Sequence, residues 1–175
     1  VVGLIGTGAQ SEFQTHAMLS LFSIEEVRYF DRDKRAMEKY ARNMTTADVR
    51  LVACASAEEA VRGADIVTTC ICEKAKVELF PYASVKNTRA LYINAIGGDC
   101  PGKTELDPRI LKEARVVVEY FEQTKEEGEI QNLAGSRQGK TSARRNNLGR
   151  AASWHEDIAV QEGVAVPNEC ASAVD

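Results

Sequence analysis

The 175-residue sequence predicts an α/β fold built on a mostly parallel, doubly wound sheet of six strands. Short apolar runs alternate with stretches of helical periodicity over the first three quarters of the chain, which indicates repeated strand–helix units. One of these runs, Asp65–Cys72, shows no regular polar alternation, and this is typical of a strand buried on both faces. A sheet covered by helices on both sides accounts for both observations.

The expected strands and helices succeed one another along the chain. We predict strands at Val2–Ile5, Glu26–Phe30, Arg50–Cys54, Asp65–Cys72, Arg89–Ala95 and Arg115–Glu119. We predict helices at Ala9–Phe22, Lys34–Met44, Ser56–Arg62 and Glu122–Leu133. Ser56 and Glu59 match a capping box, in which the two side chains satisfy backbone N–H groups at a helix start. Asp107-Pro108 marks one more helix start, because the N–H that proline lacks would have no helical partner there.

Residues 134–175 depart from this pattern. The stretch from Gly135 to Arg150 is rich in Arg, Lys, Ser, Asn and Gly, and a brief apolar stretch follows only at Val160–Val166. We therefore expect one domain over residues 1–133 and a poorly ordered tail over residues 134–175.

Composition and charge narrow the classes of function. A formal net charge of −4 gives no reason to expect nucleic acid or an anionic membrane surface as a partner. No apolar run approaches the ~20 residues of a membrane-spanning helix. The five cysteines form no CxxC pair and no zinc-ligand spacing, so we expect no metal site, reduced thiols and a cytoplasmic location. His16 is interpreted as a core or surface residue of the first helix rather than a ligand.

The turn between the first strand and the first helix reads Gly6-Thr7-Gly8-Ala9-Gln10. Glycines here let the chain turn tightly and bring its backbone close to a pyrophosphate held by N–H groups at the helix start. The third glycine of the dinucleotide-binding fingerprint would fall at Ser11, so the match is incomplete. Glycines in such a turn can also serve geometry alone, and the motif by itself leaves both interpretations open.

A carboxylate at the end of the second strand favours the cofactor interpretation. Asp31 lies at about the ~20-residue distance at which an acidic residue binds the adenosine ribose hydroxyls in a Rossmann-type fold. The alternative is a surface turn residue. Because a carboxylate repels a 2′-phosphate, we expect NAD rather than NADP, although the adjacent Arg32 weakens that preference.

The loop after the fifth predicted strand leaves the sheet at the edge where α/β proteins bind ligands. Gly97 and Gly98 allow the backbone to approach a flat ring such as nicotinamide. Asp99 can act as a general acid or base, and Lys103 can meet oxygens of cofactor or substrate. The alternative makes Asp99 a turn residue and Lys103 a solvated helix flank.

Three stretches make the sequence resemble the ornithine cyclodeaminase/mu-crystallin family: residues 6–14, 63–69 and 94–106, with further similarity to residue 133. The segment Gly-Gly-Asp-Cys-Pro-Gly-Lys-Thr-Glu at 97–105 is most similar to the ornithine cyclodeaminase branch. The resemblance implies a redox-neutral conversion of L-ornithine into L-proline and ammonia, in which NAD⁺ accepts a hydride and returns it. It also implies that this is the cofactor-binding part of a homodimeric enzyme whose substrate-binding and dimerisation domain precedes Val1.

The resemblance assigns a role to each matching position. It implies that Asp99 is the catalytic acid or base at the substrate amine. Ile71 departs from the family, which has a threonine there, so only a backbone contact with the cofactor is expected. The implied cofactor-binding residues are Gly6, Thr7, Gly8, Ala9, Gln10, Asp31, Ile71, Ile96, Gly97, Gly98, Asp99 and Lys103.

Two other functions stay open within this resemblance. An NAD-dependent amino-acid dehydrogenase or ketimine reductase would consume or accumulate reduced cofactor, whereas a cyclodeaminase would not. A non-catalytic cofactor-binding module would bind NAD without turnover.

Overall fold

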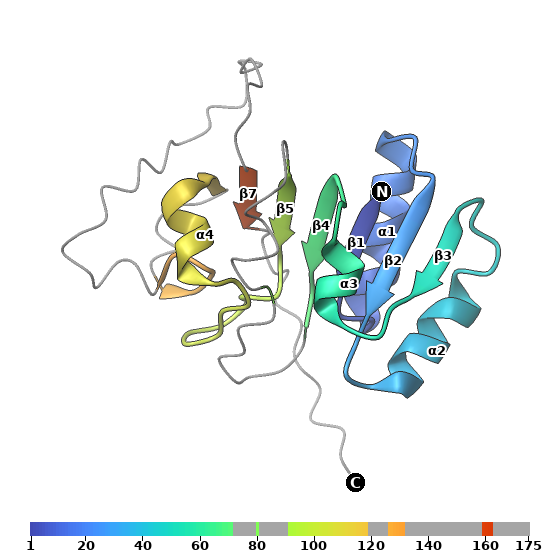
Figure 1. The fold of residues 1–175 in the computed structure, drawn as a ribbon. Coiled ribbons are helices and arrows are strands. Elements are labelled where there is room, and N and C mark those ends of the chain that lie inside the picture. Colours follow the sequence, from blue (N-terminus) through green and yellow to red (C-terminus); the bar gives the residue numbers. More distant parts are fainter. Residues whose placement is uncertain (72–79, 81–90, 119–125, 132–158, 163–175) are drawn as a thin grey trace, which may run out of the picture.

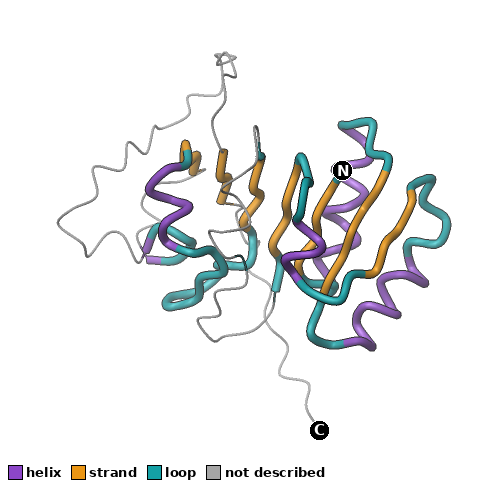
Figure 2. Tube along the Cα trace, viewed as in Figure 1, coloured by secondary structure: helices purple, strands orange, loops and turns teal. Residues whose placement is uncertain are grey.

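The computed structural model describes residues 1–71, 80, 91–118, 126–131 and 159–162. They form one parallel sheet with helices packed against it (Figure 1), and Figure 2 separates helix, strand and loop by colour. The strands are β1 (Val2–Ile5), β2 (Glu26–Phe30), β3 (Arg50–Ala53), β4 (Ile66–Thr69), β5 (Tyr92–Ala95), β6 (Arg115–Val118) and β7 (Ala159–Glu162). The helices are α1 (Ala9–Leu21), α2 (Lys34–Asn43), α3 (Ala57–Val61) and α4 (Pro108–Glu113).

The sheet is doubly wound, as predicted. Its strand order is β3-β2-β1-β4-β5-β7-β6, and every neighbouring pair is parallel. The chain therefore builds outward from β1 to β3 in one direction, returns to the other side of β1 with β4, and continues there to β5. The carboxyl ends of the strands meet at one edge of the sheet.

Two apolar clusters lie on opposite faces of the sheet, and β1 supplies both. Val2 and Leu4 point into the cluster that includes Tyr40 of α2, whereas Ile5 points into the cluster that includes Val61 of α3. Gly3 faces α3 so closely that a Cβ atom there would lie 2.8 Å from the Ala60 carbonyl oxygen. The alternation buries both sides of the strand, as expected for a parallel sheet between two helical layers.

Most predicted elements are confirmed to within one residue, and α3 shows why. The Ser56 hydroxyl accepts a hydrogen bond from the Glu59 N–H, 3.1 Å, and the Glu59 carboxylate accepts one from the Ala55 N–H, 2.7 Å. The strand predicted at 65–72 is shorter, because it ends at Thr69. The N–H of Ile71 bonds to the Glu105 carboxylate instead of a neighbouring strand. The strand predicted at 89–95 begins later, at Tyr92. Residues 72, 89–90 and 119 of the predicted strands lie outside the described residues.

Two predictions about the second half of the chain were wrong. The sheet has seven strands rather than six, because β7 lies between β5 and β6 and comes from the segment expected to be a tail. The rest of 134–175 lies outside the described residues. The continuous helix predicted at 122–133 is also wrong where it is described, since residues 127–130 form a bend and a turn. Gly128 has φ +91° there, and its N–H donates to the Gly98 carbonyl, 2.7 Å.

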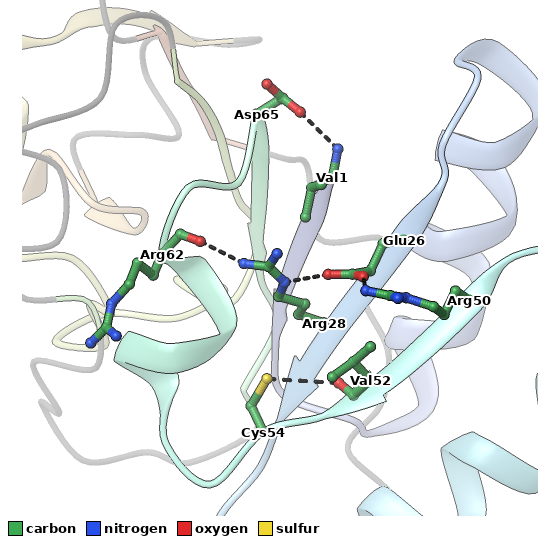
Figure 3. Close-up of polar contacts among 8 residues, drawn as sticks. All are labelled: Val1, Glu26, Arg28, Arg50, Val52, Cys54, Arg62 and Asp65. Carbon is green, nitrogen blue, oxygen red and sulfur yellow. Dashed lines mark hydrogen bonds and ion pairs between the residues drawn. The ribbon is translucent and has the colours of Figure 1, made fainter.

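The amino edge of the sheet carries a buried carboxylate held by two arginines (Figure 3). Glu26 begins β2, and its side chain is 8% exposed. One oxygen of Glu26 accepts from Arg28 Nε and the other from Arg50, which begins β3. Arg28 also donates to the Arg62 carbonyl after α3, 2.6 Å. This cluster ties together two strands and a helix at the edge opposite to the predicted site.

Candidate functional site

The predicted site residues lie at the carboxyl edge of the sheet, around the point where strand order reverses. Gly6 follows β1, Asp31 follows β2, Ile71 follows β4, and Ile96 follows β5. β1 and β4 are neighbours on the two sides of the point where strand order reverses. In doubly wound folds the crevice that holds a ligand lies at this point, outside the carboxyl ends of the strands. The fold therefore brings the separate sequence motifs to the region where doubly wound proteins bind ligands.

Gly6 has to be glycine for steric reasons. Its φ is +98°, and a Cβ atom there would lie 2.7 Å from the Cys70 carbonyl oxygen. The same Cβ would lie 2.9 Å from the Ile71 side chain, so the turn after β1 packs directly against the end of β4. Gly8 is different, because a Cβ there would meet nothing within 4 Å. The space beside Gly8 is open, as an approaching ligand requires.

Helix α1 is the one helix in the described part of the chain without a side-chain cap. Asp33, Ser56 and Asp107 each accept a hydrogen bond from a first-turn N–H of α2, α3 and α4. Gly8, the N-cap of α1, has no side chain to do this, and Ala9 and Gln10 are exposed. The Ser11 N–H bonds to the Gly8 carbonyl, 3.2 Å. The N–H groups of Ala9 and Gln10 are the ones at this helix start that suit an anion.

Ser11 replaces the third glycine of the fingerprint without loss of packing. It is fully buried, and its hydroxyl donates to the Gly8 carbonyl, 2.6 Å. Its own carbonyl accepts from the Thr15 hydroxyl, 2.8 Å, which in turn lies 2.8 Å from the Tyr40 hydroxyl. Burial raises the pKa of Tyr40 to about 12, so its hydroxyl stays protonated in this chain of contacts. A small polar residue therefore satisfies the close helix–sheet approach.

The Asp31 carboxylate points back to the glycine turn. Its Oδ2 accepts from the Thr7 N–H, 2.7 Å, and from the Thr7 hydroxyl, 3.1 Å. Its Oδ1 accepts from the Asp33 N–H, 3.0 Å. These bonds fix the carboxylate beside the start of α1, where a ribose next to a bound pyrophosphate would lie. The bond from Asp33 is one that a turn residue makes, and the two bonds from Thr7 in addition tie Asp31 to the glycine turn.

The structure brings Asp99 and Lys103 together. Lys103 Nζ donates to Asp99 Oδ1, 2.7 Å, and the lysine is 3% exposed while the Asp99 side chain is 40% exposed. Lys103 is therefore not a solvated helix flank. A buried ammonium that reaches an accessible carboxylate holds that carboxylate in one orientation. The pair can present one carboxylate oxygen to a bound molecule.

Glu105 belongs to the same site, although the sequence analysis gave it no role. It is 2% exposed, and its Oε1 accepts from the Ile71 N–H, 2.7 Å. A Cβ atom on Gly97 would lie 1.9 Å from the same oxygen, so the carboxyl fills the space that a side chain at 97 would need. The one sequence signal for Glu105 is its place two residues after Lys103, and this spacing does not distinguish a buried carboxyl from an exposed one.

Glu129 and Gln131 support the loop from outside it. Glu129 is buried, and its two oxygens accept from the N–H groups of Glu105 and Leu106, 2.8 and 2.9 Å. The Gln131 amide donates to the Lys103 carbonyl, 2.9 Å. The described part of the segment predicted as a polar helix therefore holds the loop after β5 in place. These contacts depend on tertiary packing, which no local sequence pattern reports.

The carboxyl edge also contains polar atoms that the fold leaves unsatisfied. Three buried side-chain oxygens in the described part have no hydrogen-bond partner of normal geometry: Thr68 Oγ1, Thr69 Oγ1 and Glu105 Oε2. Burial raises the pKa of the Glu105 carboxyl, while the Thr69 side chain, the Ile71 N–H and the Lys103 charge act in the opposite direction. Burial also raises the pKa of the Cys70 thiol beside this site. Buried oxygens without a partner are rare in native proteins and call for an explanation, of which a role in the site is one.

Other classes of site are less supported. The described residues contain no group of three or more His, Cys, Asp and Glu side chains arranged to hold a metal ion. Among the described helices, none is long and apolar enough to span a bilayer. Cys54 and Cys70 are buried free thiols, Cys100 is a partly exposed one, and Cys72 and Cys170 lie outside the described residues. His16 is exposed on α1.

Comparison with known proteins agrees with this geometry. The model of the ornithine cyclodeaminase/mu-crystallin family matches residues 1–153. An ornithine cyclodeaminase of Brucella suis biovar 1 (strain 1330) is 46% identical over 132 residues, which are 75% of this chain and 36% of that protein. An alanine dehydrogenase of Archaeoglobus fulgidus is 39% identical over 137 residues, which are 78% of this chain and 40% of that protein.

A solved structure extends the similarity to three dimensions. An archaeal alanine dehydrogenase dimer with bound NAD superposes with a TM-score of 0.78 at 32% identity. The match covers 93% of this chain and 52% of that chain. This chain spans less than half the length of the curated relatives it matches.

Proposed function

The chain belongs to the ornithine cyclodeaminase/mu-crystallin family, and from this we propose that it is the cofactor-binding part of an NAD-dependent enzyme that converts L-ornithine into L-proline and ammonia. The observation that carries the proposal is the convergence at one sheet edge of an uncapped helix start, the oriented Asp31 carboxylate and the Asp99–Lys103 pair. The first two features suit a dinucleotide, and the Asp99–Lys103 pair suits a proton transfer at the substrate.

The residues present fit NAD. The open space at Gly8 and the backbone N–H groups of Ala9 and Gln10 at the uncapped start of α1 suit a pyrophosphate. Gly6, Thr7, Ala9 and Gln10 would form its cradle. Asp31 would accept from the adenosine ribose hydroxyls, which favours NAD over NADP. Ile96, Gly97, Gly98 and Lys103 would line the nicotinamide end, with Ile71 across the crevice. The N–H of Ile71 is already bonded to Glu105, so any cofactor contact there uses other atoms.

Asp99 is the residue that we assign to proton transfer. NAD supplies the hydride acceptor and donor when bound. Asp99 Oδ1 is held by Lys103, and no described residue bonds Oδ2, so this oxygen can take or give a proton at the substrate amine. The protein's second task is to keep the intermediate in place between oxidation and reduction, because early release would end the redox-neutral cycle.

The choice of ornithine over other amino acids rests on branch similarity. The Brucella suis ornithine cyclodeaminase is 46% identical and the Archaeoglobus fulgidus alanine dehydrogenase 39% identical to this chain. The archaeal alanine dehydrogenase structure, which holds NAD, keeps a dehydrogenase as the second candidate function. That structure is a dimer, and we propose a homodimer for the whole protein as well. The free thiols favour the cytoplasm as its location.

The test uses the whole protein with ornithine and a catalytic amount of NAD⁺. Proline and ammonia should form in equal amounts without accumulation of NADH. Asp99→Asn should lower kcat by about 10²-fold or more while cofactor binding persists. NADH rising in step with substrate loss would make the protein a dehydrogenase, and NADH binding without any turnover would make it a binding module.

A further inference from the structure

Glu105 connects two segments that border the crevice from different strands. Its Oε1 accepts the hydrogen bond from Ile71, the second residue after β4. Its carboxyl also packs against Gly97, the second residue after β5, so closely that a Cβ atom there would lie 1.9 Å from Oε1. The backbone bonds between the ends of β4 and β5 reach as far as the Ile96 N–H, which donates to the Thr69 carbonyl, 3.0 Å. The carboxyl of Glu105 continues the connection beyond the end of the sheet.

The position of Glu105 is itself fixed by contacts with residues 126–131. Glu129 accepts from the N–H groups of Glu105 and Leu106, so the backbone that carries the carboxyl cannot slide along the loop. Gly98 is held in the same way, because its carbonyl accepts from the Gly128 N–H, 2.7 Å. Glu105 and Gly98 are therefore both held by the 126–131 segment. Without the Glu105 carboxyl, Ile71 and the Gly97-Gly98 turn would be free to move independently of each other.

The oxygens of Glu105 are used differently from those of the other buried glutamates. Both oxygens of Glu26 accept from arginines, and both oxygens of Glu129 accept from backbone N–H groups. Glu105 Oε2 makes no hydrogen bond of normal geometry to a described residue, although the Thr69 side chain and the Gly97 N–H both act on the carboxyl and lower its pKa. The groups that act on Glu105 therefore come from the ends of both β4 and β5, as expected for a carboxyl that holds two segments together.

We propose that Glu105 is a positioning residue, whose carboxyl ties Ile71 to the Gly97-Gly98 turn and thereby sets the shape of the nicotinamide end of the crevice. The proposal rests on the proposed function for its ligand, NAD, and on the contacts above for its geometry. Gly97 is part of the device, since any side chain there would displace the carboxyl. Glu105 touches neither the ribose end near Asp31 nor the start of α1, so its effect is confined to one half of the cofactor.

The geometric half of the proposal needs no cofactor. Amide hydrogen exchange of Ile71 is measured in the 175-residue chain by NMR. Glu105→Ala should speed exchange at Ile71 by about tenfold or more, because its acceptor is lost, and Glu105→Gln should restore protection through its own carbonyl oxygen. Gly97→Ala should reproduce the effect of Glu105→Ala. An Ile71 amide that exchanges equally in all four chains would overturn the proposal.

The functional half compares two ligands, NADH and ADP-ribose, which lacks nicotinamide. Glu105→Ala should weaken NADH binding by about tenfold and change ADP-ribose affinity by less than about twofold, with Glu105→Gln close to the wild type. Equal losses for both ligands would overturn the proposal, because they would report general damage. Glu26→Gln is the matched control, since it alters a buried carboxylate at the opposite edge and should leave both affinities unchanged.

Gly97→Ala in the Glu105→Ala background separates positioning from direct contact. If Gly97 matters because of Glu105, the second change should add little to the NADH loss. A full additional loss would mean that position 97 acts on the cofactor directly and would count against the proposed device. Failure of the wild-type chain to bind either ligand would instead refute the proposed function, while the exchange of Ile71 would still decide the geometry.

Discussion

Two buried carboxylates, Glu26 and Glu105, lie at opposite edges of the same parallel sheet. Glu26 has a cation on each oxygen and connects β2, β3 and the end of α3. Glu105 accepts from the Ile71 N–H, is acted on by Thr69 and the Gly97 N–H, and has one oxygen without a bond of normal geometry to a described residue. Both oxygens of Glu26 are thus satisfied by cations, whereas those of Glu105 are not.

The buried polar groups that stabilise this fold and those proposed to serve its function lie at opposite edges of the sheet. At the amino edge both oxygens of Glu26 have partners within the protein, as a cluster that holds strands together requires. At the carboxyl edge three buried oxygens lack a hydrogen bond of normal geometry to a described residue, those of the Thr68 and Thr69 hydroxyls and one of Glu105, and Gly8 offers α1 no side-chain cap. Groups of this kind lower the stability of the isolated fold and are retained where a ligand needs them.

The largest effect on stability is expected at the amino edge. Glu26→Ala leaves Arg28 and Arg50 without their carboxylate, and should lower the free energy of unfolding by about 2 kcal/mol, since Arg50 is largely exposed and part of the pair's energy is screened. Urea unfolding measures this loss. The affinity for NADH should stay within about twofold of the wild type. A marked loss of NADH affinity would break the separation between the two edges.

A pair of variants that each replace one cation with methionine compares the two edges directly. Lys103→Met removes the buried ammonium that holds Asp99, and should weaken NADH binding by about tenfold, equivalent to about 1.4 kcal/mol. Arg50→Met is the matched variant at the amino edge, and should cost stability with no change in NADH affinity. Isothermal titration of both variants provides the comparison. Similar NADH affinities for the two would contradict the assignment of Lys103 to the cofactor site.

The smallest expected effect is a pH dependence of stability. Burial raises the folded-state pKa of Glu105 above its ordinary value of 4.5, so folding favours the protonated carboxyl. This contribution to stability is complete below about pH 4.5 and is lost as the pH rises through the folded pKa. Glutamine cannot ionise, so the stability of Glu105→Gln relative to the wild type should increase over that window. A difference in urea midpoint between Glu105→Gln and the wild type that stays constant from about pH 4 to about pH 8 would contradict this prediction.

The sequence predicted the surroundings of the glycine turn better than those of the loop after β5. Gly6, Gly8 and Asp31 follow from backbone requirements that recur at fixed spacing, and the structure places them together through the Thr7–Asp31 bonds. The pairing of Asp99 with Lys103 was expected only as a shared location, because i, i+4 spacing in a loop does not fix a contact. Which alternative held for Lys103 was decided by burial.

Glu105, Glu129 and β7 could not be predicted for a common reason. Each depends on packing between segments far apart in the chain: Glu129 reaches back over 20 residues to Glu105, and β7 enters between two strands that precede it. The predicted helix at 122–133 had the right composition, but Gly128 takes a positive φ to bond with Gly98. Tertiary contacts here outweigh local helix propensity.

We propose that NAD binds at the carboxyl edge of the sheet, where buried groups are unsatisfied, and not at the amino edge. The most direct measurement is amide hydrogen exchange of the chain with and without saturating NADH. We predict new protection at residues 6–10 and 96–98, with no change at Glu26, Arg28 or Arg50. Protection confined to the amino edge, or none at residues 6–10 although NADH is bound, would contradict the account.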